Sequence, residues 1–179
     1  MKRWVFLLLL VGCGSPAPQS DWERQNAKKE PAEEQVELPA FPAAANLLEF
    51  NVEEADGFRF FVDRPTLSVS KDRIVRYTLV ARSPDGVQNV SYEGLRCPTA
   101  DYRTYAFGRP DGSWSTSRTG WRSLEAPSAP RWRVILYRDY FCPQNEAIRN
   151  AGEGVRALEQ GGHPFAKGFG APGALSPSR

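Results

Sequence analysis

Histidine, cysteine and methionine are scarce in this sequence of 179 residues, with one, three and one copies. Such scarcity excludes most His-dependent catalysis and most zinc sites, so the sequence predicts no catalytic residue, metal or cofactor. No apolar run reaches the roughly 20 residues that a transmembrane helix needs, and mean hydropathy is −0.49. Lys and Arg number 23 against 21 Asp and Glu, so the basic excess typical of a nucleic-acid-binding protein is missing.

The N-terminus has the layout of a secretory signal. Lys2 and Arg3 precede an apolar run from Trp4 to Val11. A charged start, a short apolar stretch and a small residue at the cleavage point are the three parts of such a signal. The sequence therefore predicts a signal peptide over residues 1–12.

The residues that follow the apolar run predict a lipid anchor. The motif Leu-Val-Gly-Cys at residues 10–13 resembles the bacterial lipobox, in which the cysteine is acylated. We expect lipidation of Cys13, and the alternative is an ordinary signal that is cleaved further along. Gly14, where Asp would retain the protein in the inner membrane, resembles an outer-membrane sorting signal. The predicted location is the periplasmic side of the bacterial envelope, as an outer-membrane lipoprotein bound to the membrane through its lipid.

Composition divides the rest of the chain into three parts. Residues 13–46 begin with Cys13, which we expect to be lipidated. The rest of this segment is rich in Pro, Ala and Glu, which bury too little surface to offset the ordering entropy, so we expect a disordered tether. Aromatic and β-branched residues cluster in 47–162, the predicted globular domain. Residues 163–179 are rich in Gly, Pro and Ser and predict a disordered tail. It begins with His163, which we interpret as a polar loop residue.

Apolar and polar residues alternate with period two in the first half of the domain. Such alternation is typical of half-buried strands. Turns containing Pro-Asp-Gly at residues 83–86 and 109–112 separate the strands. The sequence predicts an α+β fold, an antiparallel β-meander of about five to seven strands with one or two C-terminal helices packed on it. The expected strands cover residues 58–63, 66–70, 75–82, 87–97, 102–107 and 113–115.

Two segments near the C-terminus have helical spacing. Apolar residues in 131–142 recur at helical intervals and end before Pro143. The same residues also alternate with arginines, so a strand is the alternative, and we favour the helix. Residues 148–158 carry a clearer apolar face, and the pair Gly161-Gly162 is typical of a helix end.

The cysteines predict one disulfide. With Cys13 lipidated, Cys97 and Cys142 remain. Two cysteines in a domain that faces an oxidising periplasm are expected to bond to each other. The alternative, a redox-active or nucleophilic cysteine, lacks both a Cys-x-x-Cys pair and a histidine near either cysteine in sequence.

Arginine is abundant, with sixteen Arg and two Lys from residue 47 onward. Arginine beside aromatic residues binds anions, sugars and protein surfaces by stacking and bidentate bonding. We interpret this as a binding face for an envelope protein or a glycan. The alternative is that the genome favours arginine codons and the aromatics fill a small core. The candidate residues are Arg103, Arg109, Trp114, Arg118, Trp121 and Arg122.

Scattered acidic residues leave a second function open. Two carboxylates that meet in space can hydrolyse a substrate, although the spacing in sequence gives no sign of a pair. The favoured hypothesis is a non-catalytic binding or structural module, and the alternative is a small periplasmic hydrolase using acidic and arginine residues. The acids considered are Glu93, Asp101, Asp111, Glu125, Asp139 and Glu153.

Several blocks of the sequence resemble one family. Val-Arg-Tyr-Thr-Leu-Val-Ala-Arg at 75–82, Asn-Val-Ser-Tyr-Glu-Gly at 89–94 and Tyr-Arg-Asp-Tyr-Phe-Cys-Pro at 137–143 are similar to the cryptic neisserial protein 1-like family of β-proteobacterial envelopes. The resemblance covers roughly residues 47–162. It implies a periplasmic or lipid-anchored protein and implies no particular activity or catalytic residue.

Overall fold

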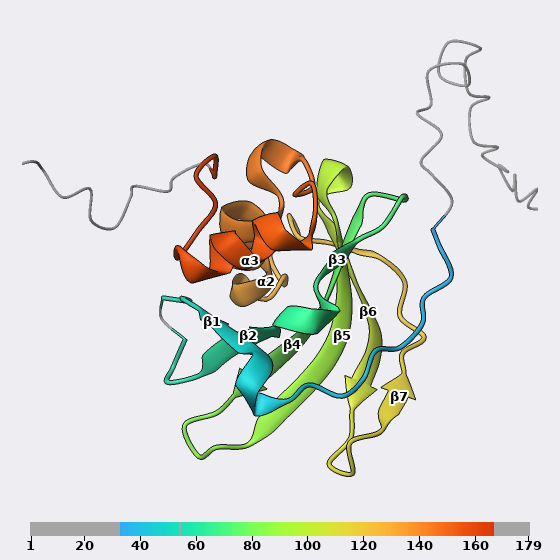
Figure 1. The fold of residues 1–179 in the computed structure, drawn as a ribbon, viewed down its shortest axis with the longest axis vertical. Coiled ribbons are helices and arrows are strands. Elements are labelled where there is room, and N and C mark those ends of the chain that lie inside the picture. The colour runs from blue at the N-terminus through green and yellow to red at the C-terminus, as the bar shows by residue number, and fades with distance from the viewer. Residues whose placement is uncertain (1–32, 54, 167–179) are drawn as a thin grey trace, which may run out of the picture. The chain divides into compact units, whose positions relative to one another are not determined.

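The computed structural model describes residues 33–53 and 55–166. They form one antiparallel sheet with helices packed on one of its faces (Figure 1). The signal peptide, Cys13 and residues 167–179 lie outside the described residues. Among the residues that are described, no helix is long and apolar enough to span a bilayer.

The sheet is a meander, as the sequence predicts. Its strands follow the order β1-β2-β4-β5-β6-β7, while β3 pairs with β4 and β8 pairs with β6. All pairings are antiparallel. The eight strands are β1 (Leu47–Phe50), β2 (Arg59–Asp63), β3 (Ser68–Val69), β4 (Ile74–Arg82), β5 (Gln88–Arg96), β6 (Asp101–Gly108), β7 (Trp114–Thr116) and β8 (Arg122–Ser123).

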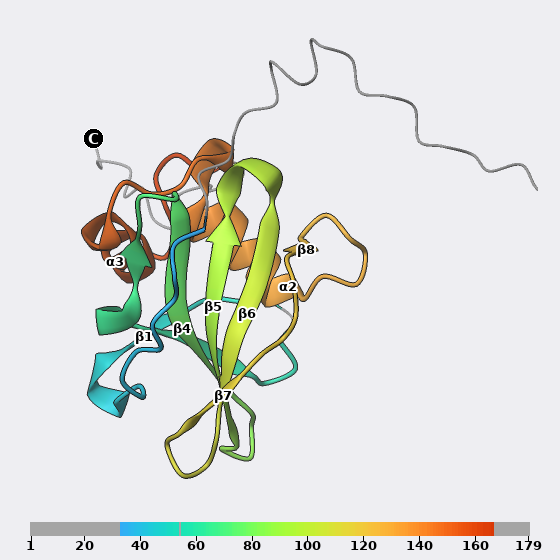
Figure 2. The ribbon, with the colours of Figure 1, turned by 90° about the vertical axis from the view of Figure 1, so that its right-hand side faces the viewer.

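The two Pro-Asp-Gly turns close the β4–β5 and β6–β7 hairpins. Gly86 and Gly112 have φ angles of 85° and 80°, a left-handed conformation that glycine adopts without steric cost. Figure 2 shows β4, β5 and β6 side by side, with the hairpin loops gathered at one end. The β4–β5 pairing runs without interruption from its turn through nine residue pairs, so this hairpin fixes its own register, whereas the β5–β6 pairing shifts register between Tyr92 and Glu93.

Two helical segments cover one face of the sheet. The helix α2 (Arg131–Ile135) continues directly into the π-helical segment η4 (Leu136–Phe141). The prediction of a helix over 131–142 is therefore confirmed, and the alternative of a strand is wrong. The second helix, α3 (Ala151–Glu159), precedes Gly161 and Gly162, whose φ angles are 76° and 156°. Short 3-10 segments complete the chain: η1 (Ala44–Asn46), η2 (Arg64–Thr66), η3 (Cys97–Thr99) and η5 (Pro143–Asn145).

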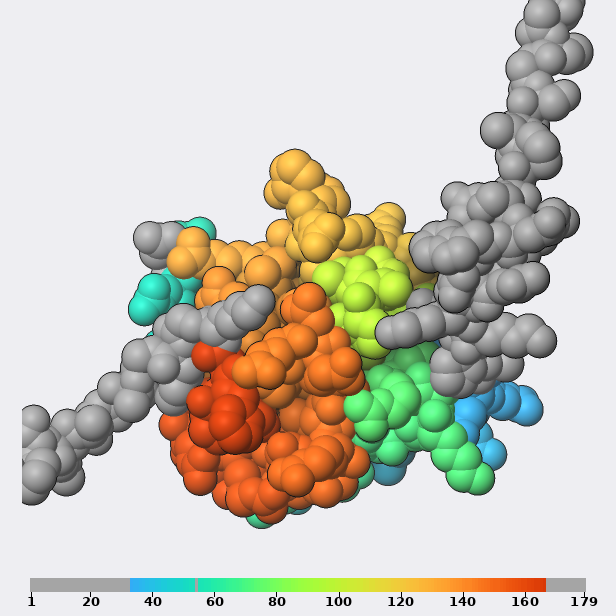
Figure 3. Space-filling model, turned by 90° about the horizontal axis from the view of Figure 1, so that it is seen from above, coloured from blue at the N-terminus to red at the C-terminus, as the bar shows by residue number. Residues whose placement is uncertain are grey.

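The main core lies between the sheet and these helices. Side chains such as Tyr77 and Leu95 from the strands pack with Leu136 from η4 and Leu158 from α3, and all are nearly inaccessible to solvent. Seen from above, the orange and red C-terminal segments gather on one side of the molecule (Figure 3). Helix and sheet thus bury the apolar faces that each presents.

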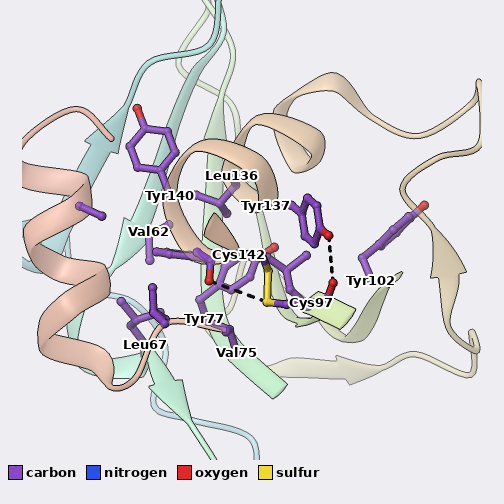
Figure 4. Packing of buried hydrophobic residues seen from close by; sticks show 14 of the residues in the cluster. Val62, Leu67, Val75, Tyr77, Cys97, Tyr102, Leu136, Tyr137, Tyr140 and Cys142 are labelled. Atoms are coloured by element: carbon purple, nitrogen blue, oxygen red, sulfur yellow. Dashed lines mark hydrogen bonds between the residues drawn. A yellow bond between two sulfur atoms is a disulfide. The ribbon is translucent and has the colours of Figure 1, made fainter. Parts of the chain in front are cut away.

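The predicted disulfide is present within this core. Cys97 and Cys142 bond with an S–S distance of 2.02 Å and are 0% and 1% exposed. Figure 4 shows the bond among buried side chains, beside a hydrogen bond of 2.9 Å that the Tyr137 hydroxyl donates to the carbonyl of Cys97. The disulfide joins the end of β5 to the end of η4.

Residues 33–43, which we call the strap, lie against the opposite face of the sheet. Val36 packs against buried Tyr105. The rings of Phe41 and Trp114 are 5.3 Å apart between centroids, and the Trp114 indole donates a 2.8 Å hydrogen bond to the carbonyl of Pro39. In Figure 1 the strap is the blue segment that passes β6 and β7 on its way to β1.

The strap corrects the predicted domain boundary. The disordered tether was expected to extend to residue 46, but residues 33–46 belong to the folded unit and lead directly into β1. The segment is polar on average, so its composition resembles a linker. A few spaced apolar side chains are enough to hold it, because the sheet offers aromatic partners that the local sequence does not reveal.

The predicted tail also begins too early. His163 is 3% exposed, and its backbone N–H donates a 2.7 Å hydrogen bond to the carbonyl of Asp139. The imidazole Nε2 lies 3.2 Å from the Glu153 carboxylate. The interpretation of His163 as a polar loop residue in a disordered tail is therefore wrong, since the chain folds back on α3 after Gly162.

Candidate functional site

Two residues of the predicted binding face converge on the strap. Glu33 accepts hydrogen bonds of 3.1 Å from Arg103 Nη1 and 3.1 Å from the Trp121 indole. It also accepts a 2.8 Å bond from the Tyr105 hydroxyl, and Arg76 Nη2 lies 4.0 Å from its carboxylate. We call Arg76, Arg103, Tyr105 and Trp121 the carboxylate cradle.

The predicted binding face does not include two members of the cradle. Arg76 and Tyr105 lie on β4 and β6, on either side of β5, and are 4% and 6% exposed. Asp72 holds the Arg76 guanidinium through two hydrogen bonds of 3.1 and 2.6 Å. Burial opposes ionisation of Asp72, but these bonds and two backbone N–H donors lower its pKa. The signal available in the sequence was Arg76, a charged residue within the mostly apolar strand β4.

The other predicted residues are distributed around this face. Trp114 lies beneath Phe41 of the strap. Arg109 is exposed in the β6–β7 turn, where its Nη2 lies 3.4 Å from the Ser115 hydroxyl. Arg118 and Arg122 are exposed on the segment that follows β7. The strap therefore covers part of the predicted face and leaves the three arginines at its edges open.

A second surface lies on the helix-covered face, where α2 leaves part of the sheet open. A hollow of about 490 Å³, the aromatic hollow, lies between α2 and strands β2, β4, β5 and β6. Most of its lining is apolar, with Asn89, Ser91 and Arg133 as the polar exceptions. The lining residues are Phe58, Phe60, Leu79, Ala81, Asn89, Val90, Ser91, Phe107, Trp132 and Arg133.

The aromatic rings of the hollow are ordered against one another. Phe58 stacks on Phe60 with centroids 6.4 Å apart, and Phe60 stacks on Trp132 at 5.7 Å. Phe58 and Phe107 remain 38% and 49% exposed. Exposed aromatic side chains that line one concavity are typical of an interaction site rather than of a monomer surface.

The one charged residue in the lining is neutralised from below. Arg133 forms a double contact with Glu93, with Nη2–Oε1 at 2.7 Å and Nε–Oε2 at 3.0 Å. Burial opposes the charged form of Arg133, but bonding to Glu93 raises its pKa. Burial and the nearby Glu93 raise the pKa of Tyr77, whose hydroxyl lies 3.3 Å from Oε2 of Glu93. The hollow therefore presents apolar walls with no net charge.

A larger hollow of about 540 Å³ beside η4 has a different character. Its walls include Arg138 and Asp139, which bond to each other at 2.6 Å through two pairs of atoms. Because this pair satisfies itself and the walls are mainly polar, the geometry favours the aromatic hollow as the candidate site.

Four of the six acids considered for hydrolysis are engaged with separate partners. Glu93 binds Arg133, Asp139 binds Arg138, and Glu153 binds Arg149. Asp111 accepts bonds from Ser113 within its turn. Within residues 33–53 and 55–166, no cluster of three or more His, Cys, Asp or Glu side chains is arranged to hold a metal ion.

These features define a class of protein: an α+β domain whose meander carries helices on one face and an extended strap on the other. A family model, the CNP1-like family, matches residues 26–159, and the chain belongs to that family. The match confirms the resemblance found in the sequence and includes the strap as well as the sheet and helices. No curated protein and no solved structure matches the chain.

Proposed function

We propose that this protein is a lipid-anchored binding module of the bacterial cell envelope, without catalysis of its own. The aromatic hollow is the observation that carries the proposal. Phe58 and Phe107 line this hollow and leave part of their apolar surface exposed to solvent. Burying such surface against a partner contributes about 25 cal/mol of binding free energy per Å². The exposed rings therefore favour binding of a partner in the hollow.

The chemistry of the hollow favours an uncharged apolar segment of an envelope protein as its partner. The Arg133 charge is already compensated by Glu93 at 2.7 Å, so an anionic group would find no free countercharge there. Asn89 and Ser91 supply neutral polar contacts at the wall. An apolar side chain flanked by backbone groups fits both properties, as buried anchors at protein interfaces do.

The membrane anchor is the second part of the proposal. The lipobox-like residues 10–13 support acylation of Cys13 and location on the periplasmic side of the outer membrane. Several acyl chains on one cysteine anchor a protein stably, since each buried CH₂ contributes about 0.8 kcal/mol. The test is palmitate labelling of cells that express the wild type or Cys13→Ala. Label and membrane association should disappear together in the variant, and an unchanged membrane fraction would contradict the anchor.

The partner is tested by photo-crosslinking from the full lipoprotein in intact cells. A photoreactive phenylalanine analogue replaces Phe107, and the matched control places it at Phe165, which is 67% exposed and does not line the hollow. We expect one crosslinked envelope protein from position 107 only, with the link mapping to an uncharged apolar segment. Phe58→Asp should abolish that product.

Two results would contradict the proposal. One is the same set of products from positions 107 and 165, which would mean unspecific contact. The other is a position-107 crosslink that maps to a charged segment and survives Phe58→Asp, since the hollow would then not be the binding surface.

A further inference from the structure

The carboxylate cradle is built like a ligand site and lies on the face of the sheet opposite the aromatic hollow. Three donors, from Arg103, Tyr105 and Trp121, reach the same carboxylate at 2.8–3.1 Å. Charge-assisted bonds of this kind are about twice as strong as neutral ones. The occupant, Glu33, comes from the strap, whereas the donors come from β6 and from the loop before β8.

The cradle is held in shape by contacts that do not involve Glu33. Arg76 is fixed by Asp72 at 2.6 Å. Both Arg76 and Arg103 lie over the Tyr105 ring, at 5.6 and 5.3 Å from its centroid. The rings of Tyr105 and Trp121 meet edge to face at 6.4 Å. Because these partners order one another, the donors keep their arrangement when the carboxylate leaves.

The charge of the cradle requires an anion. Arg76 and Arg103 carry two positive charges, and Asp72 and Glu33 balance them. Without Glu33, one positive charge remains among side chains of which Arg76 is 4% exposed. Arg76 Nε and Arg103 Nε are also buried and have no hydrogen-bond partner among the described residues. An uncompensated, partly buried charge is costly, so the cradle has a strong preference for a carboxylate.

Glu33 belongs to an extended segment, the strap, and a hollow lies along one side of that segment. A hollow of about 450 Å³ borders the cradle between the strap and the edge of the sheet, with Arg103, Tyr105 and Thr116 in its wall. The strap from residue 33 to 43 contains neither helix nor strand. Segments with few ladder hydrogen bonds open at lower free energy than the core, so the strap can leave while the sheet stays folded.

We propose that the carboxylate cradle is a binding site for a glutamate side chain of an acidic peptide partner, and that Glu33 occupies it in cis in the resting protein. The attached strap presents Glu33 at a high effective concentration, about millimolar for a short linker. A partner therefore binds when its own acidic segment displaces the strap. The site is self-blocked, and it is separate from the apolar site of the aromatic hollow.

The test uses the full chain carrying Glu33→Ala, with N-acetyl-glutamate methylamide as the probe and N-acetyl-glutamine methylamide as its neutral counterpart. The indole N–H resonance of Trp121 reports occupancy. We expect saturable binding of the glutamate probe to the variant, about tenfold tighter than the glutamine probe because the charge-assisted bonds are lost in the amide. Wild type should bind about tenfold more weakly than the variant, since Glu33 competes.

Two variants make the test specific. Glu37→Ala removes an exposed carboxylate from the same strap and should behave like wild type. Glu33→Ala combined with Arg103→Gln should lose the preference for glutamate. If Glu33→Ala does not fold, Glu33→Gln keeps the side-chain size and is titrated with the same probes. Folded variants that show no saturable shift, or equal affinity for both probes, would overturn the proposal, and the cradle would serve only to fasten the strap.

Discussion

Glu93 is a carboxylate at the centre of β5 that is fully removed from water. It survives there because Arg133 contacts both of its oxygens and the Ser91 hydroxyl donates a 2.7 Å bond to Oε1. Burial of an ion pair brings little net stability, but loss of one partner strands the other. The pair links α2 to the sheet beneath the aromatic hollow, so it holds one wall of that hollow in place.

Replacing one member of this pair should be severe. Arg133→Met is expected to lower the free energy of unfolding by about 3–5 kcal/mol, because the Glu93 charge stays buried without a counterion. Urea denaturation measures the change. Adding Glu93→Gln in the same chain should recover part of the loss, since no buried charge then remains. A loss below about 1 kcal/mol for Arg133→Met would contradict the importance of the pair.

Glu153 makes the start of α3 sensitive to acid. Burial opposes its ionisation, but bonds from the Arg149 side chain and backbone, and from His163, lower the pKa of Glu153 from 4.5 to about 2. A carboxyl whose pKa is lower in the folded protein stabilises it above the unfolded pKa. That stability is present above about pH 4.5 and is lost as the pH falls towards 2.

The variant Glu153→Gln tests this pH dependence. At pH 7 it should be about 1–2 kcal/mol less stable than wild type, because the ionic bonds to an exposed Arg149 are screened by solvent. The difference should shrink as the pH is lowered from 4.5 to 2. Urea denaturation at several pH values measures it, and a difference that is constant across this range would refute the linkage.

At the scale of elements, α3 shows how packing overrides helix propensity. A β-carbon built on Gly154 would lie 2.6 Å from Ile148 Cδ1 and 2.8 Å from Leu67 Cδ2. The helix therefore approaches its neighbours closely only because residue 154 is glycine. At Gly152 the nearest atom is Asn150 Oδ1, the oxygen that caps the helix, at 3.3 Å.

Alanine at these two positions should have opposite effects. Both changes gain about 1 kcal/mol of helix propensity. Gly154→Ala should nevertheless lose about 1–3 kcal/mol of stability through overpacking, while Gly152→Ala should be neutral or gain up to about 1 kcal/mol. Thermal unfolding of the two variants side by side measures the contrast. Equal effects would show that α3 can move away from Ile148 and Leu67 without loss of stability.

At the scale of the whole molecule, one covalent bond joins the sheet to the helices that pack on it. The disulfide between Cys97 and Cys142 spans 45 residues, from the end of β5 to the end of η4. Those residues include β6, β7, β8 and α2. The bond therefore restrains the unfolded chain over the segment that brings the helices back to the sheet.

Removing this bond should weaken the whole fold. Cys97→Ala with Cys142→Ala is expected to lower the free energy of unfolding by about 4 kcal/mol, the chain-entropy value for a loop of this length. Both sulfurs are buried, so a thiol reagent added after mild reductant should label native wild type only once it is unfolded. Rapid labelling of the folded protein under these conditions would show that the bond is accessible and does not close the core.

Much of the fold is legible in the sequence because it depends on local patterns. Two-residue alternation identifies β4 to β6, the Pro-Asp-Gly turns identify the hairpins, and helical spacing identifies 131–142. The sequence does not predict strands β1 and β8, since they have only four and two residues and too short a pattern to show alternation. Within the described part of the chain the sheet therefore has eight strands, against the predicted five to seven.

The candidate sites were much less legible. Arg103 and Trp121 were named from their type, but the cradle also needs Arg76, Tyr105 and Glu33, which come from three distant parts of the chain. The aromatic hollow exists because α2 leaves one end of the sheet open. Phe107 is exposed, but the sequence around it shows the same alternation that surrounds a buried phenylalanine in a strand. Alternation therefore does not reveal whether such a side chain is buried or exposed.

The sequence by itself determined the class of fold, the pairing of the two domain cysteines and the family, because each depends on residue type, short-range spacing or a cysteine count. Tertiary structure alone decided where the domain begins, which arginines face a carboxylate and which aromatics stay exposed. Those properties depend on which surfaces meet after the chain has closed, as when Glu33 of a polar segment meets four side chains from β4, β6 and the loop before β8.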